Sequence, residues 1–146
     1  HVGWDEAPQS STKTKLALIG WREWVAVSEL GGLTFRAKVD TGADTCALNA
    51  SHIQVLGDTV SFRCGKKSYS LPLKELREIK SSNGSSGLRP VVELRTVLGS
   101  RERTHEFTLA DRQAMRFPVL LGRNFLQGSY CVDVSQSYVF KKPSVS

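Results

Sequence analysis

The feature that most constrains the fold is a series of short segments in which hydrophobic and polar residues alternate. Segments 34–39, 60–64 and 69–73 alternate in this way, and glycines lie between or beside them. Alternation with a period of two gives an extended strand one buried and one exposed face. Several such strands, with turn residues about every 8–12 positions, are typical of a barrel or sandwich. The predicted fold class is therefore all-β.

Turn residues between these segments predict four hairpins. They pair 24–27 with 34–39, 60–64 with 69–73, 91–98 with 106–109, and the two flanks of the glycine- and serine-rich segment 81–87. A short apolar run at 118–121 and final strands at 130–134 and 138–140 complete the prediction. Helical patterns are confined to 111–116 and 123–127.

Length and composition describe one folded domain without membrane insertion. The chain has 146 residues, of which 40% are hydrophobic and 23% charged, as in ordinary globular domains. Its longest apolar stretch, residues 16–21, is far shorter than the roughly 20 residues that span a bilayer. Residues 1–14 are polar and aperiodic and are interpreted as a tail or linker, with the domain at 15–146.

The charge and the cysteines exclude some classes of function. The net charge of +6 favours anionic partners, but only 8% of residues are aromatic and no aromatic–basic strand is present, so nucleic acid is not expected as a partner. The three cysteines include no CxxC pair, and neither HExxH nor a P-loop occurs, so no metal or other cofactor is expected. The polar lead-in without an initiator Met favours a periplasmic over a cytoplasmic location, although free thiols favour the cytoplasm.

Two segments carry the candidate chemistry. The predicted strand 35–39 leads into a tight turn of small residues, with the sequence Asp40-Thr41-Gly42-Ala43-Asp44. On its own, Asp-Thr-Gly is ordinary turn chemistry. Much later, two apolar residues precede Gly122-Arg123-Asn124, and the glycine-rich hairpin lies between the two segments.

This order of segments resembles the retropepsins, the aspartic proteases of retroviruses. The chain is still more similar to a bacterial family of retropepsin-like proteins that has carried the label ATP-dependent zinc protease. The segments that carry this second resemblance are 20–26 (GWREWVA), Ser82-Asn83-Gly84 and Arg89-Pro90-Val91-Val92. The resemblance implies a closed β-barrel with the acid-protease fold, extending over roughly residues 16–140.

The resemblance also implies a role for each matching residue. Asp40, Thr41 and Gly42 would form the catalytic loop, and substrate would lie against Ala43, Asp44, Ser82, Asn83 and Gly84. Gly122 and Arg123 would support the loop, with Arg123 paired to Asp44, and Arg22 would reach Asp44 across a dimer. Aspartic proteolysis needs two carboxylates that share one proton. A chain with one Asp-Thr-Gly therefore requires a C2 homodimer.

The function expected from these residues is that of a homodimeric aspartic endopeptidase in a bacterium. Some relatives are associated with glutamate ligases, which suggests acidic or glutamate-rich peptides as substrates. The alternative is a non-catalytic module that binds an extended peptide by strand addition. It would apply if the two Asp40 side chains never meet.

Overall fold

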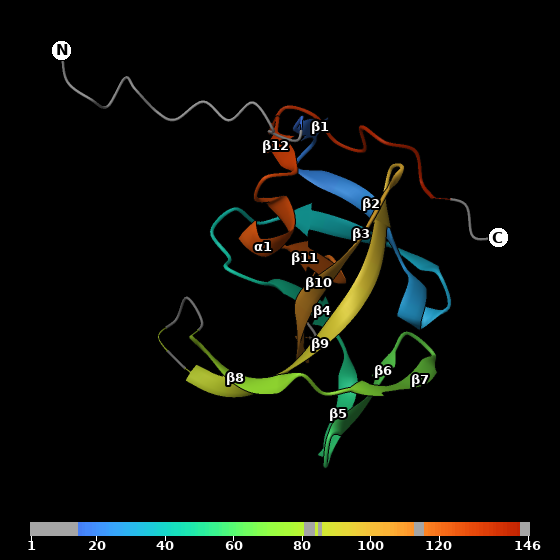
Figure 1. Cartoon of the computed structure of the whole chain (residues 1–146), viewed down its shortest axis with the longest axis vertical. Coiled ribbons are helices and arrows are strands. Elements are labelled where there is room, and N and C mark those ends of the chain that lie inside the picture. Colours follow the sequence, from blue (N-terminus) through green and yellow to red (C-terminus); the bar gives the residue numbers. More distant parts are fainter. Residues whose placement is uncertain (1–14, 81–83, 85, 113–115, 144–146) are drawn as a thin grey trace.

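The computed structural model describes residues 15–80, 84, 86–112 and 116–143. Nearly all of its regular elements are strands (Figure 1). In chain order they are β1 (Ala17–Ile19), β2 (Arg22–Val27), the 3-10 turn η2 (Ser28–Leu30), β3 (Leu33–Val39), β4 (Cys46–Asn49), β5 (Ser51–Leu56), β6 (Thr59–Cys64), β7 (Lys67–Pro72), β8 (Glu75–Lys80), β9 (Ser86–Leu98), β10 (Arg101–Ala110), β11 (Val119–Leu121), α1 (Arg123–Leu126) and β12 (Tyr130–Val132).

The main sheet closes into a barrel. Its strands follow the order β10-β4-β11-β3-β2-β9, and β9 pairs back onto β10 to complete the ring. β8 extends the sheet by pairing with the first half of β9 outside the ring. β5, β6 and β7 form a separate three-stranded sheet, and β1 pairs with β12 in parallel. The prediction of an all-β fold with a closed barrel is confirmed.

The four predicted hairpins are also present. β2 pairs with β3, β6 with β7, β8 with β9, and β9 with β10, all antiparallel. Gly99 occupies the turn between β9 and β10 with a φ of 62°, a left-handed conformation that glycine adopts without a steric cost. The predicted helix at 123–127 is confirmed as α1. Of the predicted helix at 111–116, residues 111, 112 and 116 are not helical, and 113–115 lie outside the described residues.

One predicted strand is wrong. Residues 138–140 form no strand, because Tyr138 has a φ of 52°. The backbone N–H groups of Val139 and Phe140 bind a side chain, Glu23, instead of a neighbouring strand. The predicted tail at 1–14 lies outside the described residues.

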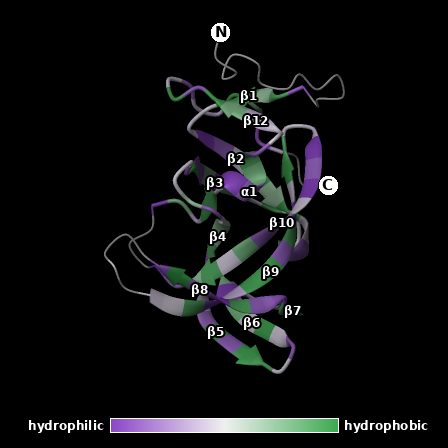
Figure 2. Ribbon diagram, turned by 60° about the vertical axis from the view of Figure 1, so that its left-hand side comes forward, coloured by the Kyte–Doolittle hydropathy of each residue, from purple (hydrophilic) through white to green (hydrophobic). Residues whose placement is uncertain are grey.

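The hydrophobic core fills the barrel interior and continues beneath the attached strands. Figure 2 shows hydrophobic and hydrophilic positions alternating along β9 and β10, as expected for strands with one face inside. The largest fully buried side chains include Phe62, Phe107, Phe125, Leu48, Leu94 and Leu121. None of the described helices is long and apolar enough to span a membrane.

A buried carboxylate fixes the segment that follows β12. Glu23 in β2 has no solvent exposure. Its carboxylate accepts hydrogen bonds from the N–H groups of Gly20 (2.8 Å), Val139 (2.9 Å) and Phe140 (3.2 Å). A buried polar group is tolerated when hydrogen-bond partners surround it in this way. Glu23 therefore attaches residues 139–140 to the barrel wall.

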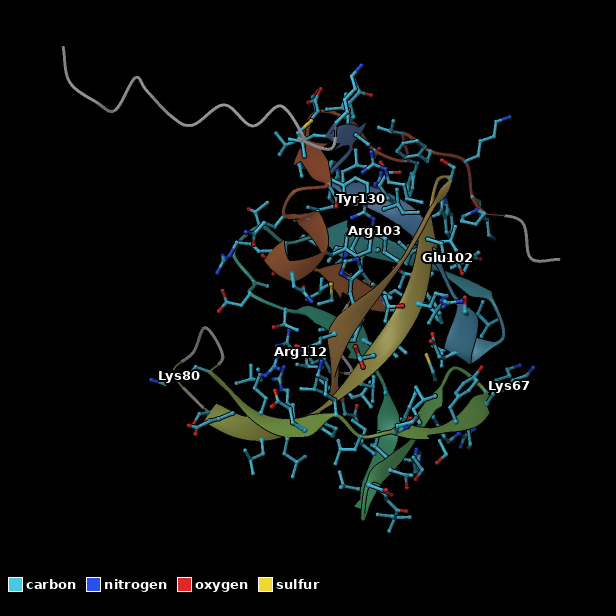
Figure 3. All side chains as sticks on the ribbon, in the orientation of Figure 1. Lys67, Lys80, Glu102, Arg103, Arg112 and Tyr130 are labelled. Carbon is cyan, nitrogen blue, oxygen red and sulfur yellow. The ribbon has the colours of Figure 1, made fainter. Side chains whose placement is uncertain are left out.

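Replacing Glu23 with Ala is expected to lower the free energy of unfolding by about 3 kcal/mol, because three backbone N–H groups lose their acceptor in a buried site. Urea denaturation followed by tryptophan fluorescence measures this change. The matched control is Glu102→Ala, which removes an exposed carboxylate on β10 (Figure 3) and should change stability by less than about 1 kcal/mol. Equal effects of the two substitutions would contradict the role assigned to Glu23.

Candidate active site

The Asp40 loop begins where β3 ends, beside the parallel strand β11. The Asp40 N–H donates to the carbonyl of Leu121 (2.9 Å), which continues the β3–β11 pairing by one residue. The Asp40 carboxylate then accepts a hydrogen bond from the Gly42 N–H (3.1 Å), and the Ala43 N–H donates to the Asp40 carbonyl (3.2 Å). The carboxylate is thus held on a short turn with its position set by backbone groups.

Gly122 lets the chain after β11 lie directly against this loop. A Cβ at position 122 would lie 2.7 Å from the carbonyl carbon and oxygen of Thr45 and 3.0 Å from the carbonyl oxygen of Ala43. Two backbone hydrogen bonds follow, from Arg123 N–H to Ala43 (2.8 Å) and from Asn124 N–H to Asp44 (3.2 Å). Only glycine fits at position 122, because backbone atoms of the loop occupy the space that a Cβ would need.

The Arg123 side chain binds residues at both ends of the loop. Its guanidinium forms an ion pair with Asp44 and donates a hydrogen bond to the Thr41 carbonyl (2.9 Å). The predicted pairing of Asp44 with Arg123 is therefore present within one protomer. Both side chains are at least half exposed, so the pair contributes little to stability and serves mainly to orient the loop.

Asn124 has a structural role that the sequence motifs did not predict. Its side-chain carbonyl accepts hydrogen bonds from the Cys46 N–H (3.0 Å) and thiol (3.3 Å), and its amide donates to the Glu106 carbonyl (2.9 Å). It thereby links β4 to β10 behind the loop. Burial raises the pKa of Cys46 to about 12, so this thiol stays neutral and acts as a hydrogen-bonding core residue. The signal for Asn124 was its place directly after Gly122-Arg123.

A cleft of about 880 Å³ lies between the loop and the β8–β9 hairpin. In Figure 1 the loop between β3 and β4 and the C-terminal end of β8 lie on the same side of the molecule. Its lining includes Asp40, Gly42, Ala43 and Asp44 of the loop and, facing them, Arg77, Glu78, Ile79, Lys80, Arg89 and Arg112. Thr41 faces a different groove.

The predicted hairpin contacts are only partly within the described residues. Ser82 and Asn83 lie outside them. Gly84 is described, with a φ of 88°, but it is not among the residues that line the cleft. The hairpin reaches the cleft instead through β8 and Arg89 of β9, which the sequence reasoning did not single out. The sequence predicted a strand on this flank of the glycine-rich segment, but not which of its side chains would face the cleft.

Cations outnumber acids on the wall of the cleft that faces the Asp40 loop, where Arg77, Lys80, Arg89 and Arg112 lie together with Glu78. Burial, and then repulsion by the Arg112 guanidinium, lowers the pKa of Arg89. Among the described residues, no carboxylate lies within ion-pair distance of Lys80, Arg89 or Arg112. Figure 3 shows Lys80 and Arg112 on the cleft side of the molecule. Clustered guanidinium and ammonium groups of this kind attract carboxylates.

The base of the hairpin is fixed to the barrel by Glu106 on β10. Its carboxylate binds Lys74 (2.7 Å) and Arg77 of β8 (2.9 Å). The hydrogen bonds from Lys74 and then Arg77 lower the pKa of Glu106. The network therefore holds together as long as this carboxylate is ionised.

Replacing Glu106 with Gln is expected to lower the free energy of unfolding by about 1 kcal/mol at neutral pH. Because the native pKa is lowered, the stabilisation is complete above the ordinary glutamate pKa of about 4.3 and is lost as the pH falls through the native value. Denaturation of both proteins from neutral to acid pH should show their difference shrinking to zero. A difference that stays constant over this range, or one equally present in Glu102→Gln, would contradict the assignment.

Arg22 does not contact Asp44 within the protomer. Its guanidinium lies between two aromatic rings, 4.6 Å from the centroid of Trp21 and 4.9 Å from that of Tyr138, a favourable cation–π arrangement. Its Nε is buried without a hydrogen-bond partner among the described residues. The pairing of Arg22 with Asp44 across a dimer stays a prediction.

A closed all-β barrel, with an Asp-Thr-Gly loop held by a Gly-Arg-Asn segment beside an antiparallel hairpin, defines the retropepsin-like class. Within that class, the chain belongs to the family described as retropepsin-like aspartic endopeptidase RimB, whose sequence profile matches residues 18–143. The family assignment made from the sequence is thereby confirmed.

Curated relatives and a solved structure agree with this placement. A protein named probable alpha-L-glutamate ligase from Shewanella pealeana is 34% identical over 138 residues, which cover 83% of this chain and 29% of that protein. One of the same name from Desulfotalea psychrophila is 33% identical over 133 residues, with coverage of 80% and 28%. The chain thus spans less than a third of these relatives. The crystal structure of Lpg0085 from Legionella pneumophila, a protein of unknown function, has a TM-score of 0.71 and 28% identity, covering 87% of this chain and all of that one.

Proposed function

We propose that this protein is an aspartic endopeptidase that acts as a homodimer. The observation that carries the proposal is the position of Asp40, held by backbone groups on a turn that opens into a cleft large enough for an extended peptide. The loop supplies one such carboxylate per protomer, so a C2 dimer would supply the required pair.

The chemistry assigned to the pair follows from its like charges. Two carboxylates about 3 Å apart cannot both ionise, so they share one proton. The ionised Asp40 takes a proton from water as the water oxygen attacks the peptide carbonyl, and the protonated Asp40 of the second copy donates to the carbonyl oxygen. When the carbon–nitrogen bond breaks, a proton passes to the departing amine. Gly42 and Ala43 leave room for the substrate backbone beside the pair.

A groove on the other side of the loop supports the dimer. It has a volume of about 650 Å³ and is lined by Thr41 and Arg123 together with apolar residues of the chain ends, among them Leu16, Leu126, Tyr130 and Val132. Leu16, which lines the groove, is about half exposed, as is Leu18 two residues later, and exposed apolar side chains beside an apolar groove make a surface suited to a partner. Because Thr41 faces this groove, a second copy seated there would bring its own Asp40 loop alongside.

An acidic peptide fits the cleft. The cations Lys80, Arg89 and Arg112 line it without carboxylate partners among the described residues. The curated relatives named probable alpha-L-glutamate ligase would make glutamate-containing products, and a domain that cleaves such products would reverse their formation. Glutamate-rich peptides are therefore the proposed substrates.

The test incubates acidic and neutral peptides with wild-type protein and with Asp40→Asn from acid to neutral pH, with fragments identified by mass spectrometry. Sedimentation of both proteins reports the dimer. Fragments from wild type alone support the endopeptidase. The same traces from both proteins, with a dimer confirmed, would favour the non-catalytic peptide-binding module.

A further inference from the structure

The segment that follows β12 lies directly against the backbone where β2 begins. We call residues 133–140 of this segment, the red coil that leaves β12 in Figure 1, the strap. A Cβ at Gly20 would lie 2.3 Å from the carbonyl oxygen of Gln136, so no side chain separates the two backbones there. Further along, the Tyr138 N–H donates to the carbonyl of Arg22 (2.9 Å). The strap is thus in backbone contact with residues 20–22.

Trp21 connects the strap to the strand that carries Asp40. Its N–H donates to the Gln136 carbonyl of the strap (2.9 Å), and its carbonyl accepts from the Val39 N–H (2.8 Å). Val39 is the last residue of β3 and directly precedes Asp40. Two successive backbone hydrogen bonds therefore lead from the strap to the residue before the candidate catalytic carboxylate.

Side chains make a second connection between the same elements. The Arg22 guanidinium lies between the rings of Trp21 and Tyr138, 4.6 and 4.9 Å from their centroids. The Tyr138 ring also stacks on Trp24 of β2, with centroids 5.4 Å apart and an angle of 29° between the rings. Cation–π and stacking contacts of this kind are attractive and restrict the orientation of each ring. The Tyr138 side chain therefore fixes Trp21 through Arg22.

Tyr138 adopts a backbone conformation that its side chain disfavours. Its φ is 52°, in the left-handed region where a bulky residue is an outlier and glycine or asparagine is more usual. The next two N–H groups, of Val139 and Phe140, are held by the buried Glu23 carboxylate. Strain of this kind persists where the surrounding structure fixes it, and it is concentrated at functional sites. The ring at position 138 thus has a role that glycine could not fill.

We infer that Tyr138 is a positioning residue for Asp40, which acts through Trp21 and Val39 on the place where β3 ends. The inference rests on the proposed function, because that function requires two Asp40 carboxylates about 3 Å apart. A displacement of about 1 Å at a reacting group can lower a rate about a hundredfold. Tyr138 is not among the described residues that line the cleft, so its effect is on the carboxylate pair and not on substrate contacts.

The first test measures amide hydrogen exchange by NMR, which does not depend on cleavage. Tyr138→Asn removes the ring but suits the left-handed backbone, so the strap itself can still form. Exchange of the Val39 N–H is expected to become about tenfold faster or more, because its acceptor Trp21 is no longer fixed, whereas amides near the start of β3 should be unaffected. Tyr138→Phe should keep the wild-type rates, because the ring remains. Tyr138→Leu gives the same comparison if Tyr138→Asn does not fold.

The second test measures cleavage of a glutamate-rich peptide as a function of pH. Tyr138→Asn is expected to lower kcat about tenfold to a hundredfold and to leave KM within about threefold, because the substrate contacts are unchanged. The two limbs of the kcat profile should also move closer together. Carboxylates that lie further apart interact less, so the two pKa values of the pair converge. Loss of stability alone would not move these limbs.

Tyr69→Asn is the matched control for both tests. Tyr69 stacks on Phe62 in the separate sheet of β5, β6 and β7, with ring centroids 5.8 Å apart, and its loss should lower stability without changing Val39 exchange or the pH profile. The same changes in Tyr69→Asn, or normal exchange and a normal profile in Tyr138→Asn, would overturn the inference. If the wild-type protein cleaves nothing, the endopeptidase proposal fails, and the exchange comparison decides the role of Tyr138.

Discussion

Replacing Asp40 with Asn is expected to reduce peptide cleavage about a thousandfold or more while leaving the fold and the dimer unchanged. The amide has nearly the shape of the carboxylate, and its oxygen can still accept the hydrogen bond from the Gly42 N–H. It cannot take up a proton, however, so neither member of the pair could activate water. Initial rates on a glutamate-rich peptide, measured by mass spectrometry, give the ratio.

Asp58→Asn provides the matched control. Asp58 is an exposed residue in the turn between β5 and β6, away from the cleft, and its replacement should leave the cleavage rate within about twofold of wild type, as for surface substitutions in general. Residual cleavage by Asp40→Asn near the wild-type rate would show that the activity does not use this carboxylate. A loss of the dimer in Asp40→Asn would mean that the residue acts through assembly.

Gly122→Ala is expected to lower the free energy of unfolding by about 2–3 kcal/mol and also to abolish cleavage. The added Cβ would lie 2.7 Å from backbone atoms of Thr45, closer than packed atoms allow, and backbone cannot move aside as a side-chain end can. The loop must then separate from the segment after β11, which breaks the hydrogen bond from Arg123 N–H to Ala43 and displaces Asp40. Overpacking of this kind typically lowers the free energy of unfolding by roughly 1–3 kcal/mol.

Urea denaturation and cleavage assays of the same samples test this expectation. Gly87→Ala is the stability control, because a Cβ at position 87 meets nothing within 4 Å, and its free energy of unfolding should stay close to that of wild type. A stable Gly122→Ala protein with normal activity would contradict the close approach on which the loop depends.

Alternation and turn residues were enough to predict much of the barrel. The hairpin β6–β7 joins two alternating segments through glycine, and β2–β3 and β9–β10 join apolar-rich segments in the same way, so both their existence and their pairing could be predicted locally. β4 and β5 were missed because the chain passes from one sheet to another at the single residue Ala50, without a glycine or proline to mark the break. The parallel pairs β3–β11 and β4–β10 join distant segments, which no local pattern specifies.

The residues of the candidate site also fall into those that the sequence predicted and those that only the fold brought together. Motifs identified the loop at Asp40 and the partnership of Asp44 with Arg123, because their spacing matches a known family pattern. The cations Arg89 and Arg112 gave no such signal, since an isolated basic residue is usually just exposed. They became candidates only when the fold brought β9 and the segment after β10 to one cleft beside the Asp40 loop.

The length of β9 has a consequence for motion. Its residues 86–90 pair only with β8, whereas residues 91–98 are part of the closed ring through β10, and Val91 pairs with both neighbours. A closed ring cannot open at one strand without breaking hydrogen bonds on both sides, so bending of the hairpin should be concentrated near Val91, next to Pro90. Amide hydrogen exchange along this one strand should therefore change abruptly from fast to slow at that point. The β8–β9 hairpin beside the cleft would then pivot about a single residue in the wall of the barrel.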